Sequence, residues 1–536
     1  MTSDYEFVIV GGGTVGCVLA SRLSLAGHNV AIFEAGPENY SEAIMSPAGA
    51  ALLHGTEAEY NYKSVPQPTL NGRQIQNFGG RLLSGSSGVN YGMWTRGHNA
   101  DYDAWARNVG EERWSYSNLL KYFKKSETFH DRSASGEIHG FDGPISTIAG
   151  VRNYPLKTSV LTAFKQSGLE FNPDINSGSP LGVSPFAENW KNHQRQPAGL
   201  AYDLSKVHVF TNSTVARIEI GPLTKCASGI VLVNGETIKA SKEVIVSCGA
   251  IKSPQLLMLS GIGPREHLES LGIRAVVDLP VGQNYHDHVS GTIFWKLKNP
   301  EAGLAFGSPQ FNDPSYFTGN PIDWVATISI PDEELEPAAN RDGTTVHELF
   351  GVGPRGHAEI VAVYAPVASA GTEFVPPFDG THISTPVALL LPTSRGEITL
   401  SSTDPTADPV INPKYLDTEV DRLIMRAGVR AALRTMETPE ALSFVEGETP
   451  PPGFPVLTSA SSDADIDARI AQIAGSFFHS AGTAAMGSVV DTTCRVKDIS
   501  RLRVCDASIL PLPLTAHYQG KPTMIPNLYF PVSDQE

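Results

Sequence analysis

The sequence has little cysteine, a deficit of positive charge and no long apolar run. Its 5 cysteines among 536 residues are odd in number and show no C-x-x-C spacing, which argues against a disulfide framework or a zinc site. Lys and Arg total 40 against 56 for Asp and Glu, so the formal charge of −16 opposes binding to nucleic acids and anionic membranes. No stretch approaches the roughly 18 apolar residues of a membrane span, and a strand-like run close to the N-terminus leaves no room for a signal peptide. We therefore expect a cytoplasmic protein without nucleic-acid or membrane partners.

The composition that remains is typical of a large globular protein. Hydrophobic residues make up 41% and charged residues 18%, enough to build cores in more than one domain. Between residues 5 and 33, an apolar run, a glycine-rich turn, a helical pattern and a second apolar run predict a β-α-β unit. Later β-type runs, from 205 to 250, predict a return to the same sheet. Helical patterns occupy 101–125, 418–436 and 464–474, whereas the acidic segment 331–336 is predicted to be a solvated loop.

The glycine-rich turn carries the pattern Gly11-x-Gly13-x-x-Gly16, followed by the acidic residue Glu34. Gly11 permits a tight turn, Gly13 lets backbone amides approach a pyrophosphate, and Gly16 lets helix and strand pack closely. The start of the helix adds partial positive charge, and Glu34 is placed to accept hydrogen bonds from a ribose. The pattern favours a dinucleotide site rather than a purely structural turn, but it does not distinguish FAD from NAD.

Other constellations favour structural interpretations. The alternating His286-Asp287-His288 has no further ligands nearby in the sequence, so a structural corner is a better interpretation than a metal site. No G-x-S-x-G elbow occurs, and this argues against hydrolase chemistry.

Five ordered segments together resemble the glucose-methanol-choline (GMC) family of FAD-dependent oxidoreductases, and the resemblance spans most of the chain. The segments are GGRLLSGSSGVNYGMWTRG (79–97), SCGAIKSPQLLMLSGIGP (247–264), GQNYHDH (282–288), FFHSAGTAAMG (477–487) and LRVCDASILPLPLTAH (502–517). The first two look like the two family signatures, and the fourth is similar to the segment that bears the catalytic histidine. The resemblance implies FAD rather than NAD.

The resemblance also assigns cofactor-binding residues. The residues expected to bind FAD are Gly11, Gly13, Thr14, Val15, Gly16, Glu34, Ala35, Leu83, Ser87, Asn90, Gly92, Met93, Val215, Asp506, Ala507 and Tyr518. Some family members attach FAD through a histidine in the first signature, and here that position corresponds to Val89. We therefore expect non-covalent FAD and no metal.

Two histidines are the candidate catalytic residues. Alcohol oxidation needs a base for the hydroxyl proton while hydride leaves for the flavin, and an imidazole titrates near the working pH. The resemblance assigns this role to His479 and an assisting role to His517, with Phe477 and Phe478 beside the base. After His517 the sequence departs from the family pattern, because Pro526 and Pro531 stand where a C-terminal helix would run.

The expected fold is α/β, with a Rossmann-like FAD-binding domain of interleaved segments and a second, mostly β (α+β) substrate domain. We expect residues 1–150, 205–290 and 475–536 to form the FAD-binding domain, and 151–204 and 291–474 to belong to the substrate side. The expected reaction is oxidation of a small-molecule alcohol to an aldehyde or ketone, with oxygen or another electron acceptor. The expected role is the tailoring of a secondary metabolite. Alternatives on the same scaffold are a non-redox hydroxynitrile lyase, a light-driven decarboxylase or an inactive binding protein. The alcohol, the choice between oxidase and dehydrogenase, and the oligomeric state are left open.

Overall fold

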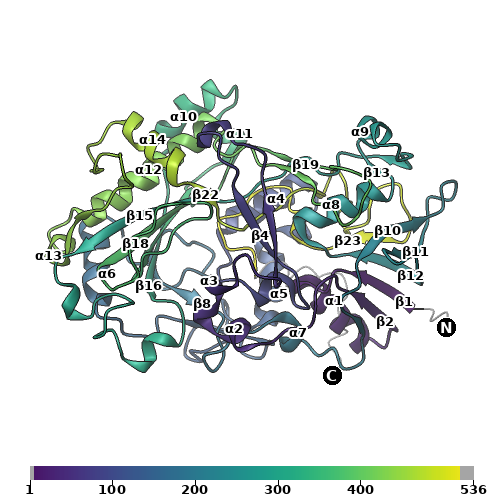
Figure 1. The fold of residues 1–536 in the computed structure, drawn as a ribbon, viewed down its shortest axis with the longest axis horizontal. Coiled ribbons are helices and arrows are strands. Elements are labelled where there is room, and N and C mark those ends of the chain that lie inside the picture. Colours follow the sequence, from purple (N-terminus) through teal and green to yellow (C-terminus); the bar gives the residue numbers. More distant parts are fainter. Residues whose placement is uncertain (1–4, 520–536) are drawn as a thin grey trace.

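The computed structural model describes residues 5–519 and is built around two large sheets, which lie at opposite sides of the molecule in Figure 1. One sheet is mostly parallel and the other is antiparallel. The predicted fold class is therefore confirmed. Among the described residues, no helix is both long enough and apolar enough to cross a membrane.

The first sheet combines segments from both ends of the chain. Its parallel part joins five strands in the order β23, β12, β1, β2 and β9, and a β10-β11 meander extends the sheet beside β12. The strands are β1 (Tyr5–Val10), β2 (Val30–Phe33), β9 (His208–Phe210), β10 (Val215–Ile220), β11 (Ala227–Leu232), β12 (Thr237–Val246) and β23 (Leu502–Val504). Because a central parallel strand is covered on both faces, β1 is apolar at nearly every position. Helices α1 (Thr14–Leu25) and α8 (Gly249–Leu259) each follow one of these strands and are largely buried.

The second sheet is antiparallel and is ordered β21-β15-β18-β17-β16-β7, with β22 beside β15. Its strands are β7 (Gly182–Pro185), β15 (Val289–Leu297), β16 (Ile322–Ile328), β17 (Ala358–Val363), β18 (His382–Leu389), β21 (Val445–Glu448) and β22 (Gly475–Ser476). Helices α6 (Lys157–Gln166), α12 (Glu419–Met436) and α14 (Asp463–Ile473) pack against it and share its core. Two of these helices confirm the patterns at 418–436 and 464–474.

The remaining elements connect the sheets or surround the cavity between them. The helices are α2 (Glu42–Met45), α3 (Ala50–Leu53), α4 (Asn99–Val109), α5 (Tyr116–Ser126), α7 (Ala198–Ala201), α9 (Arg265–Ser270), α10 (Asp332–Arg341), α11 (Val346–Phe350) and α13 (Ala441–Phe444). The strands are β3 (Glu59–Lys63), β4 (Gln76–Gly80), β5 (Glu127–Phe129), β6 (Ile145–Ala149), β8 (Ala187–Glu188), β13 (Ile262–Gly263), β14 (Val277–Asp278), β19 (Glu397–Thr399) and β20 (Val410–Asn412).

The prediction of a solvated loop at 331–336 was wrong. These residues begin helix α10, whose first turn holds Asp332, Glu333 and Glu334. Carboxylates at this end interact favourably with the exposed amides and partial positive charge of a helix N-terminus. Leu335 of the same helix is fully buried, so the acidic run is the polar face of an amphipathic helix.

The glycine at position 16 is required by close packing at the start of α1. A Cβ added to Gly16 would lie 2.0 Å from the carbonyl oxygen of Gly11, too close for any contact. We expect Gly16→Ala to lower the free energy of unfolding by about 1–3 kcal/mol, because the backbone must move to admit the methyl group. Gly447→Ala is the matched control, since a Cβ there meets no atom within 4 Å. The midpoint of urea denaturation measures both, and equal midpoints for the two variants would contradict the packing argument.

Candidate functional site

A cavity of about 1200 Å³ lies between the two sheets and is lined by residues of both. At one end it reaches Val10 and Phe33, the last residues of β1 and β2. At the other end it reaches Val361 and Val363 of β17. In open α/β sheets, ligands bind outside the carboxyl ends of the strands, so the end beside β1 and β2 is where a dinucleotide is expected.

The glycine-rich turn shapes this end of the cavity for a phosphate group. Gly11 has a φ of +96°, and a Cβ there would lie 2.4 Å from the carbonyl oxygen of Ser247. Gly13 is the N-cap of α1, and no acidic residue occupies the first turn of this helix. The positive end of the helix therefore faces the cavity with no carboxylate in its own first turn, which suits a pyrophosphate.

Glu34 is buried at the end of β2 and accepts two backbone hydrogen bonds. Its Oε2 accepts from the amide of Gly12 and its Oε1 from the amide of Gly36, each at 2.8 Å. Burial raises the pKa of its carboxyl to about 7, although these two hydrogen bonds oppose the increase. The carboxylate thus ties the glycine-rich turn to the second strand while its side chain lines the cavity.

Most of the predicted cofactor-binding residues meet at this cavity. Those that line it are Gly11, Gly13, Thr14, Val15, Glu34, Ala35, Ser87, Asn90, Gly92, Met93, Val215, Asp506, Ala507 and Tyr518. Gly16 and Leu83 are not among the lining residues. Leu83 is buried in a small apolar cluster behind the turn, and its Cδ1 would lie 2.9 Å from a Cβ on Gly12. Both positions therefore act in packing around the site.

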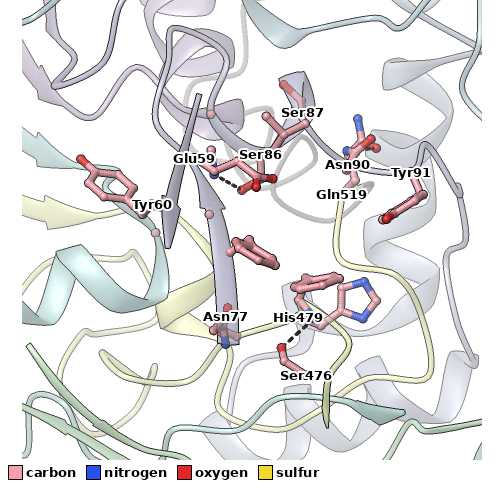
Figure 2. Close-up of a pocket in the computed structure, with 18 of the residues that line it drawn as sticks. Glu59, Tyr60, Asn77, Ser86, Ser87, Asn90, Tyr91, Ser476, His479 and Gln519 are labelled. Carbon is pink, nitrogen blue, oxygen red and sulfur yellow. Dashed lines mark hydrogen bonds between the residues drawn. The ribbon is translucent and has the colours of Figure 1, made fainter. Parts of the chain in front are cut away.

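The residues present fit a flavin dinucleotide. The carboxylate of Asp506 accepts from the amides of Gly249 and Ser508, at 2.9 and 2.8 Å, and so fixes the start of α8 beside the cavity. The Asn90 side-chain amide donates to Gln519 Oε1 at 2.8 Å, and both residues line the cavity (Figure 2). Val89, the position of covalent attachment in some resembling proteins, lines the cavity and has no nucleophilic atom.

The two predicted catalytic histidines come together at the same cavity. The ring centroids of His479 and His517 are 4.7 Å apart, with the ring planes at 81°. Phe478, directly before His479, has a φ of +63°, which is rare for a bulky residue. Its amide donates to Ser476 Oγ at 2.9 Å, and this bond helps to hold the strained turn that presents the imidazole (Figure 2).

Asp287 positions this turn from the neighbouring segment. Its Oδ2 accepts from the hydroxyls of Ser476 and Tyr415 at 2.6 Å, and its Oδ1 accepts from the His479 amide at 2.8 Å. Burial raises the pKa of the Asp287 carboxyl to about 6 against the effect of these donors. The His286–His288 segment thus forms a corner whose middle residue fixes the backbone of the predicted base.

His288 contacts the ring of the predicted base. The Nδ1 atoms of His288 and His479 are 2.9 Å apart, so one of them donates and the other accepts. If His479 donates from Nδ1, its Nε2 carries the lone pair that a base needs. A neutral His288 then bears its proton on Nε2, which lies 3.3 Å from the hydroxyl of Tyr518. This arrangement of protons suits a general base at His479.

Glu359 is a site residue that the sequence analysis missed. Its Oε1 lies 3.0 Å from Nε2 of His517, and its side chain is 3% exposed. A carboxylate in this position fixes the orientation of the imidazole. The sequence signal that could have identified Glu359 is its place as a single acidic residue inside the otherwise apolar strand β17, AEIVAV.

The wall beyond the histidines is mostly apolar. It includes Phe186, Phe306, Ile322, Val361 and Val363.

The few hydroxyl groups in this region satisfy one another. Ser290 donates to Ser369 Oγ at 3.0 Å, and Thr292 lies 3.2 Å from the same oxygen. The cavity therefore continues from the predicted flavin site into a largely hydrophobic compartment.

The described residues end at Gln519. The predicted departure from the family pattern at Pro526 and Pro531 therefore lies outside the described residues.

The pKa of Glu34 predicts a pH dependence of stability. The folded-state pKa of about 7 exceeds the ordinary value of 4.5, so the folded protein keeps a proton that the unfolded chain has lost between these pH values. The free energy of unfolding therefore falls as the pH rises from about 4.5 to 7, by about 3 kcal/mol. Glu34→Gln removes this contribution. As the pH rises from about 4.5 to 7, the denaturation midpoint of the wild type should therefore fall relative to that of the variant. Parallel pH profiles for the two proteins would contradict the assignment.

The comparisons with known proteins agree with this geometry. The family models for GMC oxidoreductase match residues 5–290 and 392–525. The GMC-type oxidoreductase acuG of Aspergillus aculeatus is 56% identical over 520 residues, covering 97% of both chains. Pyranose dehydrogenase 2 of Leucoagaricus meleagris is 32% identical and covers 96% of this chain and 90% of its own.

Solved structures are similar over nearly the whole length. Formate oxidase from Aspergillus oryzae RIB40 superposes with a TM-score of 0.87 at 28% identity, covering 98% of this chain and 97% of its own. Pyridoxine 4-oxidase from Mesorbium loti gives a TM-score of 0.85 at 27% identity, covering 98% of each chain. The chain therefore belongs to the GMC oxidoreductase family of flavoproteins.

Proposed function

We propose that the protein oxidises an alcohol to an aldehyde or ketone with FAD, with His479 as the base and His517 as its assistant. The observation that carries the proposal is the meeting of these two imidazoles at the cavity that also holds the dinucleotide-binding turn. A base and a second hydrogen-bonding group at one point can hold an alcohol oxygen between them.

The residues of the chain account for the proton and for the orientation of the substrate. His479 takes the hydroxyl proton at Nε2 while its Nδ1–H is held by His288. His517, which Glu359 orients through Nε2, lies at the same point of the cavity and helps to position the alcohol oxygen beside the base. Bound FAD supplies the two-electron acceptor for the hydride that leaves the alcohol carbon.

The proposal includes non-covalent FAD and a small-molecule alcohol, with oxygen or another acceptor completing turnover. Val89 supports the non-covalent mode, since a valine side chain offers no atom for attachment to the ring. The predicted cytoplasmic location, the absence of nucleic-acid and membrane partners, and the role in tailoring a secondary metabolite stay predictions.

The first test is the visible spectrum of the purified protein, recorded without oxygen before and after addition of aliphatic, aromatic and sugar alcohols. We expect a flavin absorbance band that bleaches with one class of alcohol. Denaturation should release the flavin from the protein, because the proposed binding is non-covalent. A bound flavin that no alcohol bleaches would contradict the proposal and favour non-redox or light-driven chemistry.

His479→Ala tests the base. We expect the rate of flavin reduction to fall by about 10²–10⁴-fold with the flavin still bound, because the hydroxyl proton then has no positioned acceptor. Stopped-flow absorbance measures the rate, and the flavin-to-protein absorbance ratio checks loading. His208→Ala is the control, since this histidine lies on the exposed edge strand β9. A reduction rate within a few-fold of the wild type would remove His479 from the mechanism.

Glu359→Ala tests the support of His517. We expect kcat to fall by about 10-fold or more, because the imidazole loses the carboxylate that orients it. Glu359→Gln keeps a hydrogen-bond acceptor in place and should retain more activity than the alanine variant. Steady-state rates over a range of pH separate the two, and equal loss in both variants would indicate a packing role.

A further inference from the structure

A second polar cluster lines the cavity apart from the catalytic histidines. It consists of His54, Glu59 and Tyr91, and all three side chains border the cavity. Nδ1 of His54 lies 3.1 Å from Oε2 of Glu59, and its Nε2 lies 3.0 Å from the hydroxyl of Tyr91. Figure 2 shows Glu59, Tyr91 and His479 around the same space. The proposed reaction uses none of the three residues of this cluster.

The cluster is held rigidly. Glu59 begins strand β3 and is 6% exposed. The imidazole of His54 is stacked on the ring of Phe78, with centroids 4.4 Å apart and planes at 15°. Stacking fixes the plane of the imidazole, and the two hydrogen bonds fix its rotation. Such a preorganised group costs little further ordering when a ligand binds.

The hydrogen bonds define what the cluster offers to a ligand. A carboxylate can only accept, so Nδ1 of His54 donates to Glu59, and in that tautomer Nε2 accepts a hydrogen bond from the Tyr91 hydroxyl. The oxygen of Tyr91 is then left with a lone pair for a donor in the cavity. Burial raises the pKa of Tyr91 to about 12, which keeps the phenol protonated at neutral pH. The group that matches this acceptor is a hydrogen-bond donor, such as a hydroxyl.

The cluster lies one side chain away from the predicted base. The ring of Phe478, which precedes His479, is 5.6 Å from the ring of His54 and 5.7 Å from that of Phe78. The surface between the cluster and the base is therefore aromatic. A ligand that reaches both groups must pass along these rings, which favours a flat, apolar body.

We propose that Tyr91, held by His54 and Glu59, binds a second hydroxyl group of the substrate, an aromatic alcohol whose ring packs beside Phe478 while its carbinol group faces His479. This inference rests on the proposed alcohol oxidation. It makes Tyr91 a specificity-determining residue, because a site that hydrogen-bonds a substrate hydroxyl discriminates strongly against an analogue without it.

The test compares benzyl alcohol with its 2-, 3- and 4-hydroxy derivatives and the corresponding methyl ethers, using the FAD-loaded enzyme. We expect one hydroxylated isomer to exceed both benzyl alcohol and its own methyl ether by at least about 10-fold in kcat/KM. Tyr91→Phe should abolish this preference mainly through KM, and His54→Phe should weaken it while preserving an aromatic stack.

Two variants serve as matched controls. His28→Phe removes a histidine that pairs with Glu6 at 3.2 Å on the surface, and Tyr122→Phe removes a hydroxyl outside the cavity. Both should leave the preference at its wild-type value. Equal rates with the hydroxylated alcohols and their ethers in the wild type, or equal losses with all substrates in Tyr91→Phe, would overturn the inference while the proposed function stands.

A binding measurement separates the two hypotheses if no alcohol reduces the flavin. Phenol and anisole are titrated into the oxidised, FAD-loaded protein, and the shift of the flavin absorbance gives each Kd. We expect phenol to bind at least about 10-fold more tightly than anisole, and Tyr91→Phe to remove the difference. Equal affinities would overturn the hydroxyl site, whereas a preference without any flavin reduction would retain the site and refute the proposed oxidation.

Discussion

The buried carboxylate of Asp287 joins the two halves of the active site. It lies one residue before His288 and two before the start of β15, and it holds the hydroxyls of Ser476 and Tyr415 together with the amide of His479. An isolated carboxylate is costly to bury, so each of these donors offsets part of its desolvation. The same contacts fix the segment that bears the base against the segment that begins the second sheet. The geometry of the histidines therefore depends on satisfying one charge that takes no part in the chemistry.

The sequence predicted the features that local physics determines. A parallel strand followed by a tight turn and a helix imposes glycine where backbones meet, and Gly11 and Gly16 stand at contacts that no Cβ could occupy. Glu34 directly follows the next strand, so its place beside the turn follows from strand pairing alone. The resemblance to the GMC family predicted His479 and His517. The structure brings them to one point, although the chain between them passes through β23 of the first sheet.

The missed features depend on contacts between distant segments. Glu359 belongs to β17, and nothing near it in the sequence indicates that it faces His517. His54 and Tyr91 likewise meet beside β3 and β4, which place Glu59 at the Nδ1 edge of the imidazole and Phe78 against its face. The error at 331–336 has a different cause, because the acidic residues were judged by charge alone and the buried Leu335 beside them was not weighed. The proline-containing segment after Gln519 lies outside the described residues.

The interleaved order of the first sheet has a consequence for biosynthesis. Strand β23 pairs with β12, whose other neighbour is β1, and Asp506 just after β23 ties down the start of α8. A ribosome must therefore translate nearly the entire chain before this sheet can close and the flavin pocket can be completed. Until then, the edge of β12 that pairs with β23 has no partner. Completion of the flavin pocket is thus a late event in the synthesis of the chain.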